Sequence, residues 1–432
     1  MVAALPFNGI LSVFFKNAME TIIILLFFVF FTMDRAVSFG LDELNIRYLR
    51  KNALHVPEFF KNTIDDETYS KTIEYTMDKE RFSRWSTLFD TLVTLWILFG
   101  GVLPWIEKWS VSFDFGAIWT GVIFIFGFGV VSFVLGLPLE WISTFYIEQK
   151  HGFNKTTVGL YIKDKLKEIA LSTAISLPVL YVVLWFMSTT GSLWWVWTFG
   201  FVMLFQLVML VIYPMFIAPL FNKFKPLEDG ELKEALTALC RKVKFSIIGI
   251  FQMDGSKRSA HANAYFTGIS KSRRIVLYDT LIKEMTVPQA VAVLAHEIGH
   301  YKLHHVKKMI VISAFGLLVG LFALGQLYDF PPFFSAFGLS NITNHAALVL
   351  FIILSKTFTF YLRPIFSAMS RKHEYEADRF CVKETLNKAN IEDALLTLTK
   401  QNLSNLTPHP WYSAFYYSHP AIIERIKAIR AI

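Results

Sequence analysis

The chain has 432 residues, of which 54% are hydrophobic and only 18% are charged. A soluble protein carries about 25% charged residues, so this composition argues against a soluble enzyme and predicts a protein whose solvent is the lipid bilayer. Basic loops beside a membrane explain the formal net charge of +8, and we expect no nucleic-acid partner, because no basic patch is interleaved with exposed aromatic residues.

Seven apolar stretches are long enough to cross a membrane, which takes about 20 residues of helix. Lysine and arginine concentrate in alternate intervals between them: the 34–83 interval has eight and the 219–308 interval has fifteen, whereas 329–345 has none. Basic loops stay in the cytosol, so we expect the N-terminus outside and the C-terminus inside. The seven predicted spans cover residues 12–33, 86–106, 117–139, 169–189, 193–218, 309–328 and 346–366.

The largest polar insertion, residues 219–308, is long enough for a small folded unit. In chain order, patterns over Lys233–Lys244, Ile275–Tyr278 and Gln289–His305 predict an amphipathic helix, a strand and a second helix. We therefore expect an all-α multi-pass membrane protein with a small α+β unit in the cytosol. Its expected parts are residues 1–218 with spans one to five, the insertion 219–308, residues 309–370 with spans six and seven, and a helical cytosolic segment over 371–432.

The second of these predicted helices carries the motif H-E-x-x-H, at His296, Glu297 and His300. The two histidines are about one turn apart on the same face, so both imidazoles can reach one Zn²⁺ at about 2.0–2.1 Å. Glu297 can take a proton from the water at the metal and later pass one to the leaving amine. The alternative is an ordinary helix with two histidines on its polar face.

A catalytic zinc needs a third protein ligand and an open fourth position. Glu374 and Asp378 follow the seventh span and are four residues apart, so one helix face would present both carboxylates. Glu374 can bind the metal while Asp378 accepts a hydrogen bond from the far nitrogen of a ligand histidine. Spacing alone leaves Glu376 as a competing ligand, and a solvated acidic face as the other alternative. A zinc between these two helices would lie at the boundary between membrane and cytosol.

Three further features have weaker signals. Residues 259–268 alternate small and polar side chains and could form the edge of a sheet, where an extended peptide binds through its backbone; an ordinary loop is the alternative. His419 could donate a hydrogen bond to the oxyanion of a tetrahedral intermediate, although a lone histidine is more often structural. His304 and His305 are expected to be exposed or to cap a helix.

Several stretches of the chain, from about residue 40 to 430, share their order and spacing with a known family. They are Asn263-Ala264-Tyr265, the H-E-I-G-H of 296–300, the box 374–378, His419-Pro420, and the stretches 145–148, 152–157 and 218–224. In these residues the chain resembles the type I CAAX prenyl proteases, which are membrane zinc metallopeptidases.

The resemblance implies Glu374 rather than Glu376 as the third ligand of one zinc per chain, and a transition-state role for His419. It also implies seven helices around a large water-filled chamber, with the zinc site facing inside. Arg363 and Arg371 would then face polar partners near the site. The residues expected to contact substrate are Asn263, Ala264, Tyr265 and Arg363.

The function implied by the resemblance is that of a membrane-embedded zinc metalloendopeptidase. The family's best-known activity removes the last three residues of proteins with a farnesylated C-terminal Cys-containing motif. The expected partners are therefore the lipid bilayer and a peptide or protein substrate, prenylated or otherwise membrane-associated. The alternatives are a membrane-protein quality-control protease of the heat-shock type with no prenyl requirement, and a non-enzymatic transporter or sensor with a structural metal. We expect the active site to face the cytosol, at the endoplasmic reticulum in a eukaryote and the inner membrane in a bacterium.

Overall fold

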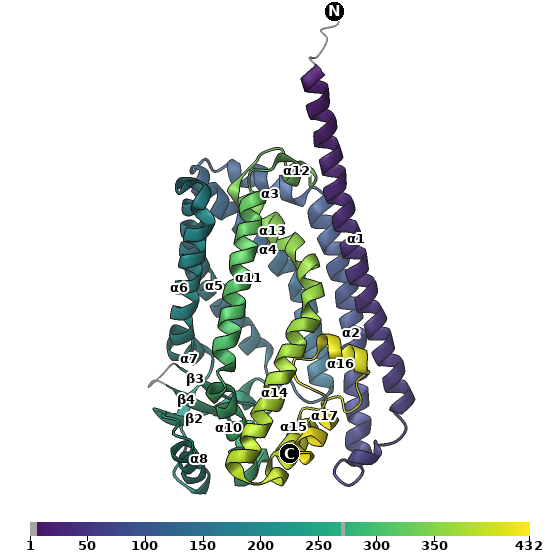
Figure 1. Ribbon diagram of the computed structural model, residues 1–432, viewed down its shortest axis with the longest axis vertical. Coiled ribbons are helices and arrows are strands. Elements are labelled where there is room, and N and C mark those ends of the chain that lie inside the picture. Colours follow the sequence, from purple (N-terminus) through teal and green to yellow (C-terminus); the bar gives the residue numbers. More distant parts are fainter. Residues whose placement is uncertain (1–6, 269–272) are drawn as a thin grey trace, which may run out of the picture.

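Long apolar helices make up most of the computed structural model, which describes residues 7–268 and 273–432, with side chains from residue 17 onward. They stand side by side in a bundle, and a small sheet with several short helices covers one end of it (Figure 1). The helices of the bundle are α1 (Phe7–Asn52), α2 (Asp66–Phe99), α3 (Val102–Val111), α4 (Ala117–Ile142), α5 (Val158–Thr189), α6 (Trp194–Ile212), α7 (Ala218–Phe221), α11 (His305–Leu327), α12 (Pro331–Ser335), α13 (Asn344–Thr359) and α14 (Arg363–Thr385).

Six helical segments of the described residues are long and apolar enough to cross a membrane, and α2 with α3 adds a seventh if the two count as one bent span. The bend of 54° lies where the sequence predicts an unbroken second span over 86–106. Gly101 there has a φ of +78°, a left-handed conformation that costs glycine little, so the helix turns at this point. The expected fold class, an all-α multi-pass membrane protein with a small α+β unit, is confirmed with that correction.

The outward faces of the spanning helices are apolar. Val130, Leu204, Val311 and Phe315 are each more than half exposed, which is unfavourable in water but natural where lipid chains are the solvent. In α4, α5, α6 and α11 only 11% of the most apolar window is buried within the protein. These helices therefore pack sparsely along their length, as helices around a chamber do.

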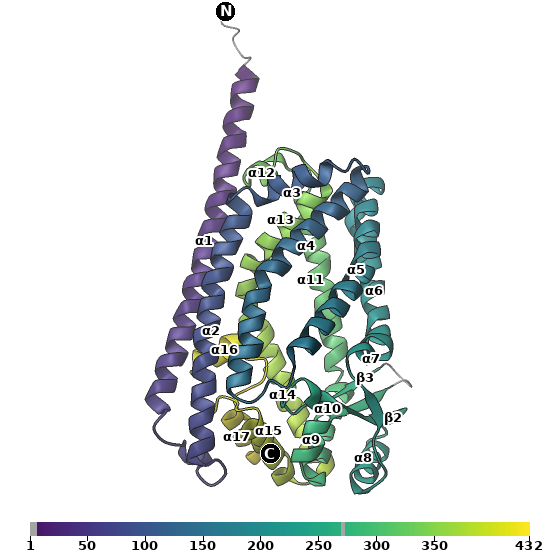
Figure 2. The same cartoon turned by 180° about the vertical axis from the view of Figure 1, so that it is seen from behind.

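Apolar cores lie at the two ends of the bundle. One, at the end with α3 and α12, includes the fully buried Leu103, Trp194 and Phe334. The other lies at the opposite end, where β-strands and short helices pack around Leu236 and Ile298. Figure 2 shows the same two ends from behind, with the long helices between them. The second core holds the elements that carry the predicted site.

The sheet at this end has four strands in the described residues, in the order β1-β2-β4-β3. β2 and β4 are parallel and the other pairs antiparallel, so β3 is an edge strand with Ala264 opposite Leu277. The predicted strand and amphipathic helix correspond to β4 and α8. The elements are β1 (Phe224–Pro226), α8 (Glu231–Lys242), β2 (Gly249–Met253), β3 (Ala264–Thr267), β4 (Arg274–Tyr278), α9 (Asp279–Glu284) and α10 (Val287–Lys302).

The helix predicted from Gln289 to His305 is shorter than expected, because α10 ends at Lys302 and α11 begins at His305. His304 between them has a φ of +60°, and this turn lets α10 pack along α14 while α11 runs up the bundle (Figure 1). No glycine or proline marks the break in the sequence. The C-terminal segment is helical as predicted, with α15 (Lys388–Gln401), α16 (Pro410–Tyr416) and α17 (Ile422–Arg430).

Candidate metal centre

Two helices, α10 and α14, bring the predicted site together. α10 begins with a capping box of Thr286 and Gln289, which pairs backbone groups that the first turn of a helix leaves free. Its H-E-x-x-H face packs on α14, and Gly299 allows the close approach: a Cβ at this position would lie 3.2 Å from the Cα of Ala377. α13 continues into α14 through one short 3₁₀ turn. The acidic residues 374–378 therefore lie on a direct extension of a membrane span, where α14 packs against α10.

His296, His300 and Glu374 form a compact cluster whose possible ligand atoms all lie within 4.8 Å of one another. The two Nε2 atoms are 3.0 Å apart, and each lies 3.3 to 3.4 Å from an oxygen of Glu374. Ligand atoms of a tetrahedral zinc, at about 2.0–2.1 Å from the metal, are about 3.3 Å apart. Glu374 Oε2 is buried and makes no hydrogen bond, with His296 Nε2 at 3.4 Å and Arg425 Nη1 at 3.5 Å. This donor set, with one carboxylate oxygen free of hydrogen bonds, fits a zinc ion.

Asp378 and Arg425 lie on the side of the His296 ring that faces away from the cluster. Asp378 Oδ1 lies 2.7 Å from His296 Nδ1, and both carboxylate oxygens accept hydrogen bonds from Arg425, at 2.6 and 2.9 Å. Burial by itself lowers the pKa of His296, but its hydrogen bonds with Asp378 and Glu374 outweigh burial and raise the pKa to about 9. The imidazole therefore lies in a field that favours a cation, whether a proton or a metal.

Arg425 is the site residue that the sequence reasoning missed. It is buried on α17, as are its neighbours Ile426 and Ile429, which pack into two different apolar clusters. An arginine on the apolar face of a short amphipathic helix is a signal in itself, because a buried cation needs an anionic partner. That signal indicates a pair but does not identify Asp378, which is 47 residues away in the chain.

Glu376, the competing ligand, points to a different partner. Its Oε2 lies 2.9 Å from Nε2 of His305, whose Nδ1 lies 3.0 Å from Nδ1 of His300. His305 also stacks on His373 at 4.0 Å. His305 is buried, so the expectation that it is exposed or capping is wrong, whereas His304 is exposed as predicted. The buried ring fills the space where α10, α11 and α14 meet.

The cluster opens into a pocket of about 390 Å³, which we call the site pocket. Glu297 lines it, and burial raises the pKa of its carboxyl group. His419 lines it as well, with Nε2 3.4 Å from Glu374 Oε1 and a side chain that is 64% exposed. Asn263 and Ala264, at the start of edge strand β3, complete the wall beside the cluster. An acidic group, a histidine and a strand edge thus surround the proposed metal position.

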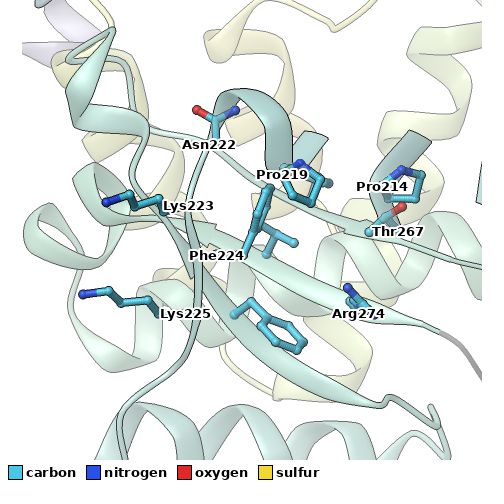
Figure 3. Close-up of a pocket in the computed structure, with 11 residues that line it drawn as sticks. Pro214, Pro219, Asn222, Lys223, Phe224, Lys225, Thr267 and Arg274 are labelled. Atoms are coloured by element: carbon cyan, nitrogen blue, oxygen red, sulfur yellow. The ribbon is translucent and has the colours of Figure 1, made fainter. Parts of the chain in front are cut away.

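Tyr265 and Arg363 lie away from the site pocket. Burial raises the pKa of Tyr265 to about 12, and this residue lines another pocket of about 510 Å³, between the sheet and the segment 214–222 that follows α6. Figure 3 shows that pocket, with Pro219, Phe224 and Arg274 around it. Arg363 is exposed, with its guanidinium 4.5 Å from the centre of the Tyr416 ring. Arg371 donates to backbone carbonyls at the end of α16, including that of Tyr417.

Known proteins match nearly the whole chain. Residues 45–223 match the family model described as CAAX prenyl protease N-terminal, five membrane helices, and residues 226–432 match Peptidase family M48. The CAAX prenyl protease 1 of Saccharomyces cerevisiae is 35% identical, over 89% of this chain and 90% of the relative. The CAAX prenyl protease 1 homolog of Homo sapiens is 33% identical, over 89% of this chain and 91% of the relative. The crystal structure of S. mikatae Ste24p superposes with a TM-score of 0.88 at 33% identity, over 94% of this chain and 98% of that one.

Proposed function

The chain belongs to the CAAX prenyl protease family of M48 metallopeptidases, and we propose that it is a zinc endopeptidase for prenylated or otherwise membrane-associated substrates. It is a multi-pass membrane protein and a metalloprotease. The observation that carries the proposal is the convergence of His296, His300 and Glu374 at a pocket that also holds Glu297. Two imidazoles and one carboxylate leave a fourth position open, as in catalytic zinc sites.

We propose that His296, His300 and Glu374 hold one Zn²⁺ per chain. Bound there, the ion would supply a Lewis acid and acidify a water molecule. Asp378 accepts from Nδ1 of His296 and so keeps Nε2 of that ring free to bind. Arg425 in turn fixes both oxygens of Asp378. These contacts orient the first histidine before any substrate arrives.

Glu297 is the proposed general base. Its carboxylate takes a proton from the attacking water and then delivers a proton to the leaving amine, and burial raises its pKa toward the range that suits both steps. His419, across the site pocket, is proposed to donate a hydrogen bond from Nε2 to the oxyanion. The exposed edge of β3 at Asn263 and Ala264 is proposed to pair with the substrate backbone.

The prenylated substrate is favoured over the two alternatives. The relatives described above bear the name CAAX prenyl protease, which supports the CAAX-type substrate rather than heat-shock quality control. A transporter or sensor with a structural metal has no use for an acidic residue beside an open ligand position. We further propose that the site faces the cytosol, because basic residues concentrate in the intervals that carry it. We also propose that the membrane is that of the endoplasmic reticulum, because the relatives described above come from eukaryotes.

The experiment is a pair of hydrolysis assays on the purified protein in lipid nanodiscs. One peptide ends in a farnesylated cysteine plus three residues, and the other is identical but bare. We expect the farnesylated peptide to be cut after the cysteine, a chelator to abolish cutting, and added zinc to restore it. Equal turnover of the two peptides would remove the prenyl requirement, and hydrolysis that resists the chelator would contradict the zinc mechanism.

A further inference from the structure

The pocket in Figure 3, of about 510 Å³, lies on the face of the sheet that points away from α10. Ile250, Ile275 and Leu277 belong to the apolar core that includes residues of α10. Successive side chains of a strand point to opposite faces, so Phe251 and Val276, which line the pocket, lie on the other face. We call this cavity the interface pocket.

The opposite wall of the interface pocket comes from the end of a helical stretch that is apolar enough to cross a membrane, Gly191–Phe221. Pro214 and Pro219, near the end of that stretch, line the pocket. Tyr213 beside them is more than half exposed, and tyrosines are enriched at the level where lipid head groups begin. The interface pocket therefore lies where the bilayer meets the polar end of the molecule.

Three basic residues line the interface pocket: Lys223, Lys225 and Arg274. Figure 3 shows the two lysine side chains side by side at one rim, directed outward, and Arg274 at the opposite rim. Within the part of the chain that the structure describes, no carboxylate forms an ion pair with any of the three. Asp254 accepts a hydrogen bond from the backbone N–H of Lys223 instead. Positive charge around an apolar wall suits a ligand that is anionic at one end and apolar at the other.

Arg274 has the position and the chemistry to bind a phosphate group. It is half-buried on β4, and its guanidinium lies 5.4 Å from the centre of the Phe251 ring. An arginine over an aromatic ring keeps its N–H groups available, and their planar fork matches the oxygens of a phosphate. Thr267, which is opposite Arg274 in the sheet, also lines the pocket and adds a hydroxyl group. The volume of the pocket lies within the range of pockets that hold small ligands.

We propose that the interface pocket binds the head group of an anionic phospholipid. Arg274 binds the phosphodiester, and the rings of Phe224 and Phe251 contact the start of the acyl chains. Lys223 and Lys225, on flexible stems, attract the additional negative charge of the head group. Anionic lipids are concentrated in the cytosolic leaflet, so the inference relies on the orientation proposed above but not on the peptidase reaction.

The test is lipid binding to the full-length protein in a mild detergent, measured by native mass spectrometry. The probes are dioleoyl phosphatidylserine and dioleoyl phosphatidylcholine, which share their acyl chains and differ in net charge. We expect phosphatidylserine to bind more tightly, and its affinity to fall about fivefold for each basic residue removed. Arg274→Met and the double variant Lys223→Met with Lys225→Met should therefore weaken phosphatidylserine binding and leave phosphatidylcholine binding nearly unchanged.

Two comparisons complete the test. Lys283→Met is the control, because it removes the same charge from an exposed position on α9, outside the interface pocket; it should leave phosphatidylserine binding as in wild type. Glycerophosphoserine, the same head group without acyl chains, should compete poorly, because it lacks the apolar contacts. If it competes as well as the whole lipid, the pocket binds a soluble phosphate ester and the lipid proposal is wrong.

Equal affinity of the wild type for the two lipids would also overturn the proposal, as would a phosphatidylserine preference that survives both sets of substitutions. The double lysine variant keeps the test decisive even if Arg274→Met fails to fold, because Lys223 and Lys225 are exposed.

Discussion

At the scale of single residues, the centre is a set of buried charges that satisfy one another. Glu374, Asp378 and Arg425 are each at least nine-tenths buried, and Arg425 lies within 3.5 Å of both carboxylates. Buried ions are expensive unless paired, so removing one leaves the others uncompensated. The same arrangement orients the proposed ligand His296. Stability and metal binding should therefore depend on the same residues.

Arg425→Met should destabilise the protein by about 3–5 kcal/mol, because it leaves Asp378 as an uncompensated buried charge. It should also weaken zinc binding by about 10- to 100-fold, since Asp378 then no longer orients His296 firmly. Arg430→Met is the matched control. Arg430 lies on the same helix and also pairs with a carboxylate, that of Glu392, but the Arg430 side chain is exposed to solvent. Thermal unfolding in detergent and zinc titration measure the two effects. Equal behaviour of both variants would contradict this role for Arg425.

The ligand assignment predicts opposite results for neighbouring glutamates. Glu374→Ala should lose zinc, because only two ligands remain, whereas Glu376→Ala should keep close to one zinc per chain, because its carboxylate lies beside His305 instead. Metal content per protein molecule decides the matter. Loss of zinc from Glu376→Ala alone would reverse the assignment.

Residue types and spacing were enough to single out His296 and His300, and to place Glu374 and Asp378 together on one face of a second helix. The choice between Glu374 and Glu376 needed the family resemblance, since both lie on the same helix. The contacts of Arg425 could not be predicted, because they depend on how α17 packs against α14. Arg363 could not be assigned for the same reason, and its substrate role stays a prediction.

At the scale of elements, the crossing of α10 and α14 sets the geometry of the centre. The two helices approach so closely that Gly299 has no room for a side chain without displacing Ala377 or Phe380. Each helix contributes part of the proposed ligand set, so their separation fixes the distances between ligand atoms. Shifts of a few tenths of an ångström at Gly299 would be felt at Glu374.

Gly299→Ala should cost about 1–3 kcal/mol in stability, as overpacked cores do, and should lower zinc affinity by moving α14 away from α10. Gly316→Ala in α11 provides the control, since a Cβ there meets nothing within 4 Å. Chemical unfolding and zinc competition assays report the two quantities. If Gly299→Ala leaves the stability and the zinc affinity unchanged, α10 and α14 can accommodate a Cβ without moving apart, and this account of their packing is wrong.

Hydropathy found the long apolar helices because the bilayer demands them. The sequence predictions missed two breaks for different reasons. The bend after Phe99 has a pair of glycines, which is a signal that the prediction did not use. The turn at His304 has none, and it arises because α11 must leave α10 to enter the bundle. The division of the chain at residues 218, 308 and 370 stays a prediction; α14 runs across the last of these boundaries.

At the scale of the whole molecule, the bundle ends in a sheet and short helices on the side proposed to be cytosolic. Basic residues dominate the intervals on this side, and the opposite loop between α11 and α13 has none. The site thus lies where an apolar substrate tail can stay among helices while its peptide end reaches polar groups. This arrangement depends on orientation, which can be measured.

Labelling of single cysteines should show that orientation. Cys240 and Cys381 are buried, so an impermeant thiol reagent should leave the native chain nearly unlabelled in sealed membranes. Lys307→Cys should react only from the cytosolic side and Asn341→Cys only from the other, because α11 separates these exposed positions. The reverse pattern would place the site on the opposite face.

The most direct measurement of the central claim is the activity of Glu297→Gln beside its zinc content. The amide keeps the shape of the side chain but cannot take a proton, so one zinc per chain should remain while hydrolysis of a farnesylated peptide falls at least ~100-fold. A Glu297→Gln protein that binds zinc and cuts the peptide at the wild-type rate would contradict the proposed mechanism.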